Sequence, residues 1–210
     1  MAINKFLNCK IDSSQRVFRP RSETKFWVGK AMEDSGFKNK NLRVLDVFSG
    51  SGCIGISLLS SFSNIERIDF VDIWPAAIKQ IKINLDLNKT KENRYKIYKS
   101  NLFQKLKGRK YNFIFANPPY VALNRISEVQ KEVLKNDPAV ALFGGKDGMV
   151  IIEKFFKQVK SYLKPNGKIF LEFDPKQKKT IKELLEGDGF RFIFRKDQFK
   201  KDRWLEVWLI

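Results

Sequence analysis

The stretch RVLDVFSGSGCIGISLLSS, from Arg43 to Ser61, decides the fold class of this chain. It begins with a short run of β-forming residues, passes through a turn rich in glycine and serine, and continues from Cys53 as an apolar segment of helical length. A strand that leads into a helix through a tight turn is typical of proteins in which strands and helices alternate. This stretch therefore predicts an α/β protein with a parallel sheet.

The alternation continues along the rest of the chain. Residues 65–72 predict a second strand, and a helix begins at Pro75, because proline is favoured in the first turn of a helix. Further strands are predicted at 95–98, 111–117 and 167–173, and further helices at about 23–34, 152–163 and 176–185. Two consecutive strand-like runs, 190–198 and 203–210, predict an antiparallel hairpin at the end of the chain. We therefore expect a mostly parallel sheet with helices on both faces.

Length and composition indicate a globular protein. The chain has 210 residues, of which 43% are hydrophobic, which is enough for one domain with a sizeable core. No segment has the length of a membrane-spanning helix, and the N-terminus has no apolar run of signal-peptide length, so we expect a cytoplasmic protein with no membrane partner. Cys9 and Cys53 suggest neither a disulfide framework nor a CxxC pair. The chain has no histidine, which excludes His-based triads and His-containing zinc sites, and no metal is expected.

The net charge of +18 suggests a nucleic acid or the ribosome as a partner, because clustered lysine and arginine attract phosphate. The basic residues are, however, spread over residues 79–110 and 176–203, and an abundance of Lys, Asn, Ile and Phe is also what an AT-rich genome produces. A solvated, lysine-rich surface is therefore the alternative. We expect at most a weak, salt-dependent association with RNA or the ribosome.

A glycine pattern follows the first predicted strand. Gly50, Gly52 and Gly55 spell G-x-G-x-x-G, and Asp72 ends the second predicted strand. This pattern is typical of sites where the backbone approaches a nucleotide and an acidic side chain binds the ribose hydroxyls. A nicotinamide-dependent dehydrogenase or a non-catalytic nucleotide-binding module is thus one hypothesis. Asp46 counts against it, because a carboxylate there suits an amine-bearing or positively charged cofactor better than a pyrophosphate. Asp46 could equally cap the following turn or hold a loop N–H.

The strand predicted at 111–117 ends in Asn117, Pro118, Pro119 and Tyr120. Because proline fixes φ and restricts the residue before it, the backbone after Asn117 is expected to be stiff and extended. The Asn117 side chain and the Pro118 carbonyl would then be two fixed acceptors with an aromatic ring nearby. That arrangement suits a flat group that carries an NH2. For N-P-P-Y taken alone, an ordinary strand end is the alternative.

The motifs together resemble class I S-adenosyl-L-methionine-dependent methyltransferases, and most closely the HemK/PrmC family of protein-(glutamine-N5) methyltransferases. RPRSETKFWV is similar to the family's P-R-P-E-T-E segment, VLDVFSGSGCIGISLL to its cofactor loop, and FVDIWPAAIKQIKIN to its acidic strand end and helix. SNLFQKL is similar to the segment beside the adenine, FANPPY to the catalytic motif, and DPAVALFGGKDGM to a stretch that ends in G-G-x-D-G. The resemblance covers nearly the whole chain.

The resemblance implies a Rossmann-like class I methyltransferase fold with a seven-stranded sheet whose final strand is antiparallel. It implies a short N-terminal segment and leading helix over residues 1–40 and a methyltransferase domain over residues 41–210. The implied cofactor is S-adenosyl-L-methionine, and the implied partner is a protein substrate, a peptide chain release factor. The residues implied to bind the cofactor are Phe48, Ser49, Gly50, Ser51, Gly52, Asp72, Ile73, Asn101, Leu102 and Asn117. Those implied to bind the substrate and catalyse the reaction are Asn117, Pro118, Pro119 and Tyr120.

The chain departs from the family pattern at several positions. Ser22 replaces a proline of the first motif, Phe48 stands where the family usually has glycine, and Asn101 stands where aspartate is common. Family members of the bacterial type carry an N-terminal helical domain that helps to dock the release factor. Only residues 1–19 precede the first motif, so we expect this chain to lack that domain.

Three further segments have two interpretations each. Arg21, Glu23 and Thr24 either begin the leading helix or shape the methionine end of the cofactor site. Gly144, Gly145 and Asp147 are expected to form a turn and a helix cap. The excursion from 121 to 143 has the length of loops that serve as lids.

The sequence leaves a second methyltransferase function open beside glutamine methylation. An exocyclic amine of a base in RNA or DNA is also a flat NH2, so N-P-P-Y could orient it. A base in a duplex would have to be flipped, which calls for a recognition domain or a long insert, and the chain has little room for either.

Overall fold

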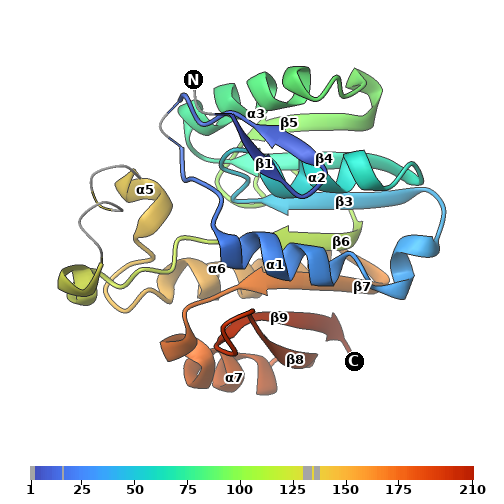
Figure 1. Ribbon diagram of the computed structural model, residues 1–210. Helices are drawn as coiled ribbons and strands as arrows, with labels where there is room; N and C mark the ends of the chain where they lie inside the picture. Colours follow the sequence, from blue (N-terminus) through green and yellow to red (C-terminus); the bar gives the residue numbers. More distant parts are fainter. Residues whose placement is uncertain (1–2, 16, 130–133, 135–137) are drawn as a thin grey trace.

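A seven-stranded sheet lies at the centre of the computed structural model, which describes residues 3–15, 17–129, 134 and 138–210 (Figure 1). The strands are β3 (Leu42–Val47), β4 (Ile65–Asp72), β5 (Tyr95–Lys99), β6 (Tyr111–Ala116), β7 (Leu163–Glu172), β8 (Phe190–Lys196) and β9 (Asp202–Leu209). Their spatial order is β5-β4-β3-β6-β7-β9-β8. Strands β3 to β7 pair in parallel, and β9 pairs antiparallel with both β7 and β8. The predicted parallel sheet with a C-terminal antiparallel hairpin is confirmed.

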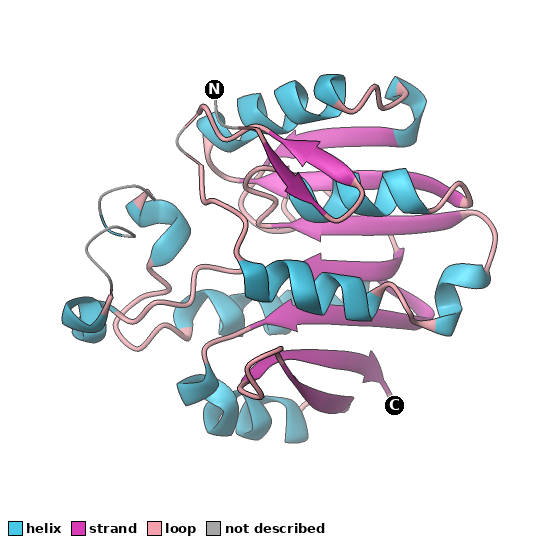
Figure 2. Ribbon diagram, in the orientation of Figure 1, coloured by secondary structure: helices cyan, strands magenta, loops and turns pink. Residues whose placement is uncertain are grey.

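Helices cover both faces of this sheet (Figure 2). One face packs against α1 (Ser22–Ala31), α2 (Cys53–Ser61) and α3 (Pro75–Leu87), and the other against α6 (Val150–Val159) and α7 (Lys178–Glu186). The strands feed both cores: Val44 belongs to the core under α1 and α2, and its neighbour Leu45 to the core under α6. Successive side chains of a strand point to opposite faces, so strands that are apolar throughout require cover on both sides.

The structure differs from the predicted boundaries near residue 163. We predicted a helix up to 163 and a strand from 167, but α6 ends at Val159, η4 (Lys160–Tyr162) follows, and β7 begins at Leu163. Leu163 pairs with Tyr111 of β6, and a register shift separates this pair from the next. The pairing with β6 extends the beginning of β7 to Leu163. Hydrophobic periodicity along one segment cannot predict pairing with a distant strand. The shorter 3-10 helices include η1 (Ser35–Lys38), η2 (Glu92–Arg94) and η5 (Pro175–Gln177).

An N-terminal hairpin was not predicted. Strands β1 (Asn4–Phe6) and β2 (Cys9–Ile11) pair antiparallel and lie over α2 and α3. The apolar side chains of this hairpin join the core under α1 and α2. Asn84 of α3 accepts a hydrogen bond from the backbone N–H of Asp12 at 2.8 Å. Strands of three residues are too short to show an alternating pattern, so their pairing depends on the surface beneath them.

The position of β3 in the sheet creates a place for a ligand. It lies between β4 and β6, and the chain continues from β3 to α2 on one face of the sheet and from β6 to α6 on the other. Ligands of such sheets bind outside the carboxyl ends of the strands at this point. The carboxyl ends of β3, β6 and β7 point toward the side of the molecule where α5 (Ala139–Leu142) lies (Figure 1). Both motifs singled out in the sequence follow these strand ends.

The segment between β6 and α6 leaves the sheet and returns. It contains η3 (Leu123–Glu128) and α5, and residues 130–133 and 135–137 lie outside the described part of the chain. Val121 and Phe143 form a parallel bridge, which ties the two ends of the excursion together. The excursion itself is present, and its role as a lid stays a prediction. Within the described ranges, no helix is long and apolar enough to cross a membrane.

Candidate functional site

A cavity of about 440 Å³ opens at the carboxyl ends of the central strands. It is lined by residues from the loops after β3, β4, β5 and β6, together with residues that precede and begin α1. All but one of the predicted site residues line it: Phe48, Ser49, Gly50, Ser51, Asp72, Ile73, Asn101, Leu102, Asn117, Pro118, Pro119 and Tyr120. The two motifs, far apart in the sequence, therefore share one cavity.

The exception is Gly52. A Cβ on Gly52 would meet Ile56 Cδ1 and Ile81 Cγ1 at 3.3 Å, so this residue faces the core behind the cavity. Its φ of +76° favours glycine, and its N–H donates to the Ser49 carbonyl at 2.7 Å. Gly52 thus shapes the turn that begins α2. Phe48 also has a positive φ, +61°, a conformation that favours glycine.

Asp72 stands where the cofactor loop meets β4. Its Oδ2 accepts the Gly50 N–H and its Oδ1 accepts the Trp74 N–H, both at 2.9 Å. Burial raises the pKa of Asp72 above its ordinary value, and the backbone N–H groups of Trp74, Gly50 and Ile73 oppose that rise. A carboxylate oxygen can accept two hydrogen bonds, so each oxygen retains capacity for a hydroxyl of a ligand.

The Asp46 carboxyl group bonds to the backbone of α2 and does not face the cavity. Its Oδ2 accepts the N–H of Gly55 at 2.9 Å, and the side chain is not among those that line the cavity. Oδ1 is buried and has no hydrogen-bond partner within the described residues. Burial raises the pKa of Asp46 to about 8, so the carboxyl group is mainly protonated at neutral pH. The structure therefore favours the interpretation in which Asp46 caps the turn that follows β3, because Gly55 lies in the first turn of α2.

The N-P-P-Y segment is held by side chains from two other elements. Asn117 Nδ2 donates to Thr24 Oγ1 of α1 at 3.4 Å, and the Tyr120 hydroxyl donates to Glu172 Oε1 of β7 at 3.0 Å. Glu172 Oε2 in turn accepts from Thr24 Oγ1 at 2.7 Å and from Trp27 Nε1 at 2.6 Å. Burial is the main reason that the pKa of Glu172 is raised, and the three donors counteract it.

The backbone of this segment is fixed as well. Gln177 Nε2 donates to the carbonyl oxygens of Tyr120, at 3.2 Å, and Gly148, at 2.9 Å. Gly148 has a φ of +81°, and a Cβ there would lie 2.3 Å from the Tyr120 carbonyl oxygen, so only glycine allows this approach. Asp147 Oδ1 accepts the Met149 N–H at 3.0 Å in a turn immediately before α6, which agrees with the predicted turn. The predicted helix cap is wrong, because the N-cap of α6 is Met149 and no side chain caps it.

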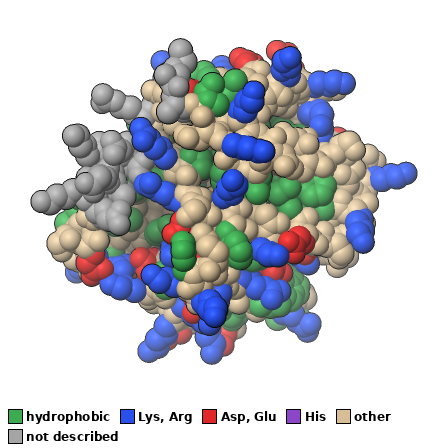
Figure 3. Space-filling view, viewed as in Figure 1, with side chains coloured by type: hydrophobic (Ala, Val, Ile, Leu, Met, Phe, Trp, Pro, Cys, Tyr) green, Lys and Arg blue, Asp and Glu red, His purple; other side chains and the backbone are tan. Residues whose placement is uncertain are grey.

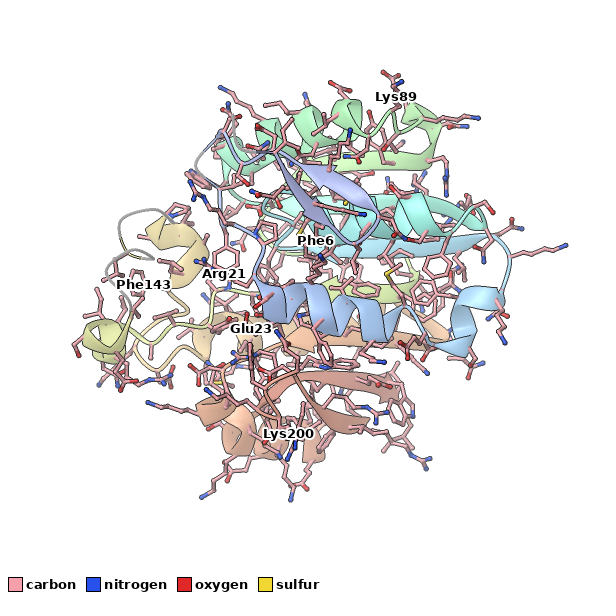
Figure 4. The ribbon with its side chains drawn as sticks, in the orientation of Figure 1. Phe6, Arg21, Glu23, Lys89, Phe143 and Lys200 are labelled. Atoms are coloured by element: carbon pink, nitrogen blue, oxygen red, sulfur yellow. The ribbon has the colours of Figure 1, made fainter. Side chains whose placement is uncertain are left out.

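Several of these residues were missed from the sequence. Glu172, Trp27 and Gln177 were not singled out, although Glu172 has one visible signal, an acidic residue at the end of the apolar run KIFLEF. In the segment before α1, Val17, Phe18 and Pro20 line the cavity and were also missed. Of the three residues given two interpretations at the start of the leading helix, Arg21 and Thr24 line the cavity and Glu23 does not. Figure 4 shows Arg21 and Glu23 at the beginning of α1 and Phe143 beside α5, near the same end of the sheet.

The molecular surface carries its charge broadly. Lysine and arginine side chains are distributed over the whole visible face (Figure 3), in agreement with the spread of basic residues along the sequence. No group of three or more histidine, cysteine, aspartate or glutamate residues in the described ranges is arranged to hold a metal ion.

The cavity fits an adenosyl cofactor in its size and its polar groups. Its volume of about 440 Å³ lies within the range of roughly 300–1,000 Å³ for small-molecule sites. Asp72 offers acceptors for a pair of hydroxyls. Gly50 has a φ of +53°, and a Cβ there would have only the Phe48 carbonyl oxygen within 4 Å, at 4.0 Å. The space above this turn is therefore open to a ligand that approaches the backbone.

Comparison with known proteins places the chain among methyltransferases. The family model described as "Methyltransferase small domain" matches residues 22–146. A release factor glutamine methyltransferase from Clostridium acetobutylicum is 33% identical over 202 residues, covering 94% of this chain and 70% of that protein. A bifunctional methyltransferase from Rickettsia conorii is 38% identical over 152 residues, covering 72% of this chain but only 29% of that longer protein.

Solved structures agree on the fold. The hMettl16 catalytic domain, solved in complex with a 3′UTR hairpin, superposes with a TM-score of 0.72 at 14% identity, covering 97% of this chain and 75% of that one. At this identity the likeness shows the class I methyltransferase fold alone. The family match extends over more than half of the chain, and the clostridial relative is matched over more than two thirds of its length. The chain belongs to the methyltransferase small domain proteins and, among them, to the HemK/PrmC family.

Proposed function

We propose that this protein transfers a methyl group from S-adenosyl-L-methionine to the side-chain amide nitrogen of a glutamine in a peptide chain release factor. One observation carries the proposal: Asn117 turns its Nδ2 toward Thr24, which leaves Oδ1 as an acceptor in a cavity that also contains Asp72 and the glycine turn. The clostridial relative's name, release factor glutamine methyltransferase, supports this choice of acceptor. A cytoplasmic location would suit such a substrate.

The proposed residues first bind the cofactor. Asp72 would accept hydrogen bonds from the ribose hydroxyls, and the open backbone at Gly50 would lie against the methionine part. Ile73 and Leu102, which both line the cavity, would hold the adenine ring between apolar side chains. When bound, the cofactor supplies an electrophilic methyl group on a sulfonium ion.

The acceptor amide is a poor nucleophile, because its lone pair is delocalised into the carbonyl group. Asn117 Oδ1 and the Pro118 carbonyl would each accept one N–H, which turns the lone pair toward the methyl group and favours a pyramidal nitrogen. The Tyr120 ring would pack against the flat amide. Alignment of this kind supplies several kcal/mol, about 7–11 in the most favourable intramolecular cases. The nitrogen becomes acidic only as it gains the methyl group, and it would then release one proton to water, so no histidine base is needed.

The decisive experiment offers radiolabelled S-adenosyl-L-methionine with separate protein, RNA and DNA acceptors. We expect label in a bacterial release factor, on the glutamine of a small-residue loop such as G-G-Q, and none in a release factor whose loop glutamine is replaced by alanine. Label in RNA or DNA, with none in protein, would replace this proposal with methylation of a base amine. Binding of a nicotinamide dinucleotide in place of S-adenosyl-L-methionine would exclude both.

A further inference from the structure

Glu172 is a buried carboxylate at the end of β7, and it joins three side chains of the site. It is 1% exposed and accepts hydrogen bonds from Thr24, Trp27 and Tyr120. Thr24, also 1% exposed, in turn accepts the side-chain N–H of Asn117. Thr24 and Glu172 are 148 residues apart in the sequence, so the fold has brought them together.

The direction of each hydrogen bond in this group follows from the chemistry of its members. An indole N–H can only donate, so Glu172 Oε2 accepts from it; when the carboxyl group is ionised, or carries its proton on Oε1, this oxygen has no hydrogen to give to a second partner. The Thr24 hydroxyl contacts the same oxygen and must therefore donate its single hydrogen to it. Thr24 Oγ1 can then act toward Asn117 only as an acceptor.

This restriction extends to Asn117. An acceptor at Thr24 requires a donor opposite, so the Asn117 side chain must present its NH2 group to Thr24 and its Oδ1 elsewhere. The reverse orientation would place two oxygens with no hydrogen between them. Thr24 is buried and Asn117 is partly buried, so two facing acceptors there cost up to about 1–3 kcal/mol, which favours one amide orientation.

We propose that Glu172, Trp27 and Thr24 form a positioning relay that fixes the orientation of the Asn117 amide, so that Oδ1 rather than the NH2 group meets the acceptor amide. The second oxygen of Glu172 holds the Tyr120 hydroxyl, so one buried carboxylate positions both ends of N-P-P-Y. This inference rests on the proposed function for its consequence in catalysis, but the orientation of the amide can be measured without it.

Thr24→Val tests the relay most directly, because it removes the hydroxyl and keeps the shape of the side chain. The Asn117 amide is then free to turn, and the turnover number should fall about tenfold to hundredfold. This loss is smaller than the loss of about a hundredfold to a thousandfold that is expected when an oriented polar group is removed outright. S-adenosyl-L-methionine affinity should stay within about threefold of the wild type, because the relay orients the acceptor rather than the cofactor. Thr24→Ser restores a hydroxyl and should restore most of the turnover.

Ser57→Ala is a matched control. Ser57 is a buried hydroxyl of α2 that donates to the Ile54 carbonyl at 2.7 Å and does not line the cavity. It should lower the melting temperature as much as Thr24→Val does, or more, without the same loss of turnover. If Thr24→Val turns over within about twofold of the wild type, or if Ser57→Ala loses as much turnover as Thr24→Val, the relay is wrong.

A spectroscopic measurement separates this inference from the proposed function. The side-chain ¹⁵N amide signal of Asn117, assigned by its loss in Asn117→Ala, should show one exchange-protected hydrogen in the wild type and in Thr24→Ser, and none in Thr24→Val. Glu172→Gln should keep that signal, because its oxygen must stay opposite Trp27, while the environment of the Tyr120 ring changes. An unprotected wild-type signal, or one unchanged in Thr24→Val, would overturn the relay. If no glutamine is methylated but the signals behave as expected, the proposed function fails and the relay stands.

Discussion

At the scale of single residues, the site depends on which atoms are left available after the protein has made its own hydrogen bonds. Asn117 gives its NH2 group to Thr24 and keeps Oδ1, and Asp72 gives one lone pair of each oxygen to the backbone and keeps the others. The proposed chemistry uses only these remaining acceptors. Substitutions at the two residues should therefore separate methyl transfer from cofactor binding.

Asn117→Ala should lower turnover about a hundredfold to a thousandfold while cofactor affinity and folding change little, because the lost bond matters mainly in the transition state. Asn117→Asp should also lower turnover, but S-adenosyl-L-methionine affinity should hold or rise, since a negative charge near the sulfonium stabilises the ground state. Single-turnover rates, calorimetry and thermal melts on both variants check this. Unchanged rates in both would mean that N-P-P-Y only ends a strand.

Asp72→Ala should weaken S-adenosyl-L-methionine binding by about 1.5–3 kcal/mol, because a charged acceptor for two hydroxyls is lost. Titration calorimetry measures this, with wild-type protein at the same pH as the reference. Because Asp72 also accepts the Gly50 and Trp74 N–H groups, the variant should melt at a lower temperature even without cofactor. Full cofactor affinity in a folded Asp72→Ala protein would exclude the ribose role.

Asp46 should make stability depend on pH. Its folded pKa, about 8, lies above the ordinary value of 3.8, so its contribution to stability is complete at low pH and is lost as the pH rises through 8. The free energy of unfolding should fall by up to about 1.4 kcal/mol per pH unit between these values. The free energy of unfolding, measured with denaturant from pH 5 to pH 9, should therefore fall more steeply in the wild type than in Asp46→Asn. Parallel curves would show that Asp46 does not ionise in this range.

At the scale of the elements, the position of the cofactor loop depends on how closely α2 lies on β4. A Cβ on Gly55 of α2 would come within 2.3 Å of Phe70 Cε1 of β4, so this glycine permits the close packing of helix and sheet. Gly29 of α1 has no such constraint, because a Cβ there would meet only Leu7 Cδ2, at 3.5 Å.

Gly55→Ala should lower the free energy of unfolding by about 1–3 kcal/mol, because the rigid ring of Phe70 cannot move aside without disturbing the core. Gly29→Ala introduces a better helix former whose Cβ makes ordinary van der Waals contact, so it should raise the free energy of unfolding by about 0.5–1 kcal/mol. Urea unfolding of the two variants provides the comparison. Equal destabilisation of both would mean that helix conformation, rather than packing against β4, governs the position of α2.

At the scale of the whole molecule, the net charge of +18 acts over a surface whose visible face carries basic residues throughout (Figure 3). The basic residues among those that line the cavity are Arg21 and Lys154. We expect weak binding to RNA whose affinity falls steeply between 50 and 200 mM salt, roughly as the neutralisation of several phosphates predicts. Fluorescence titration with an unrelated single-stranded RNA at several salt concentrations measures it. Binding that is insensitive to salt would point to a specific RNA site.

Much of this molecule could be predicted from local sequence. Strand and helix periodicity, Pro75 at a helix start and the strand–turn–helix stretch from 43 to 61 yielded the order of the elements, because each depends on neighbours within a few residues. The motif residues could likewise be placed in one cavity, since parallel strands bring their carboxyl ends to one edge of the sheet.

The remainder depended on contacts between distant parts of the chain. The N-terminal hairpin forms on the surface of α2 and α3, and β7 begins where β6 offers a partner, so neither leaves a periodic signal of its own. The contacts of Glu172 with Thr24 and Trp27 span 148 and 145 residues. Sequence alone determined which residues lie at the carboxyl ends of the strands, because a strand end depends on residues close by in the chain. Tertiary structure alone decided which atoms of these residues are already hydrogen-bonded and which are left for a ligand. The reason is that burial and long-range pairing set the partners of each polar group.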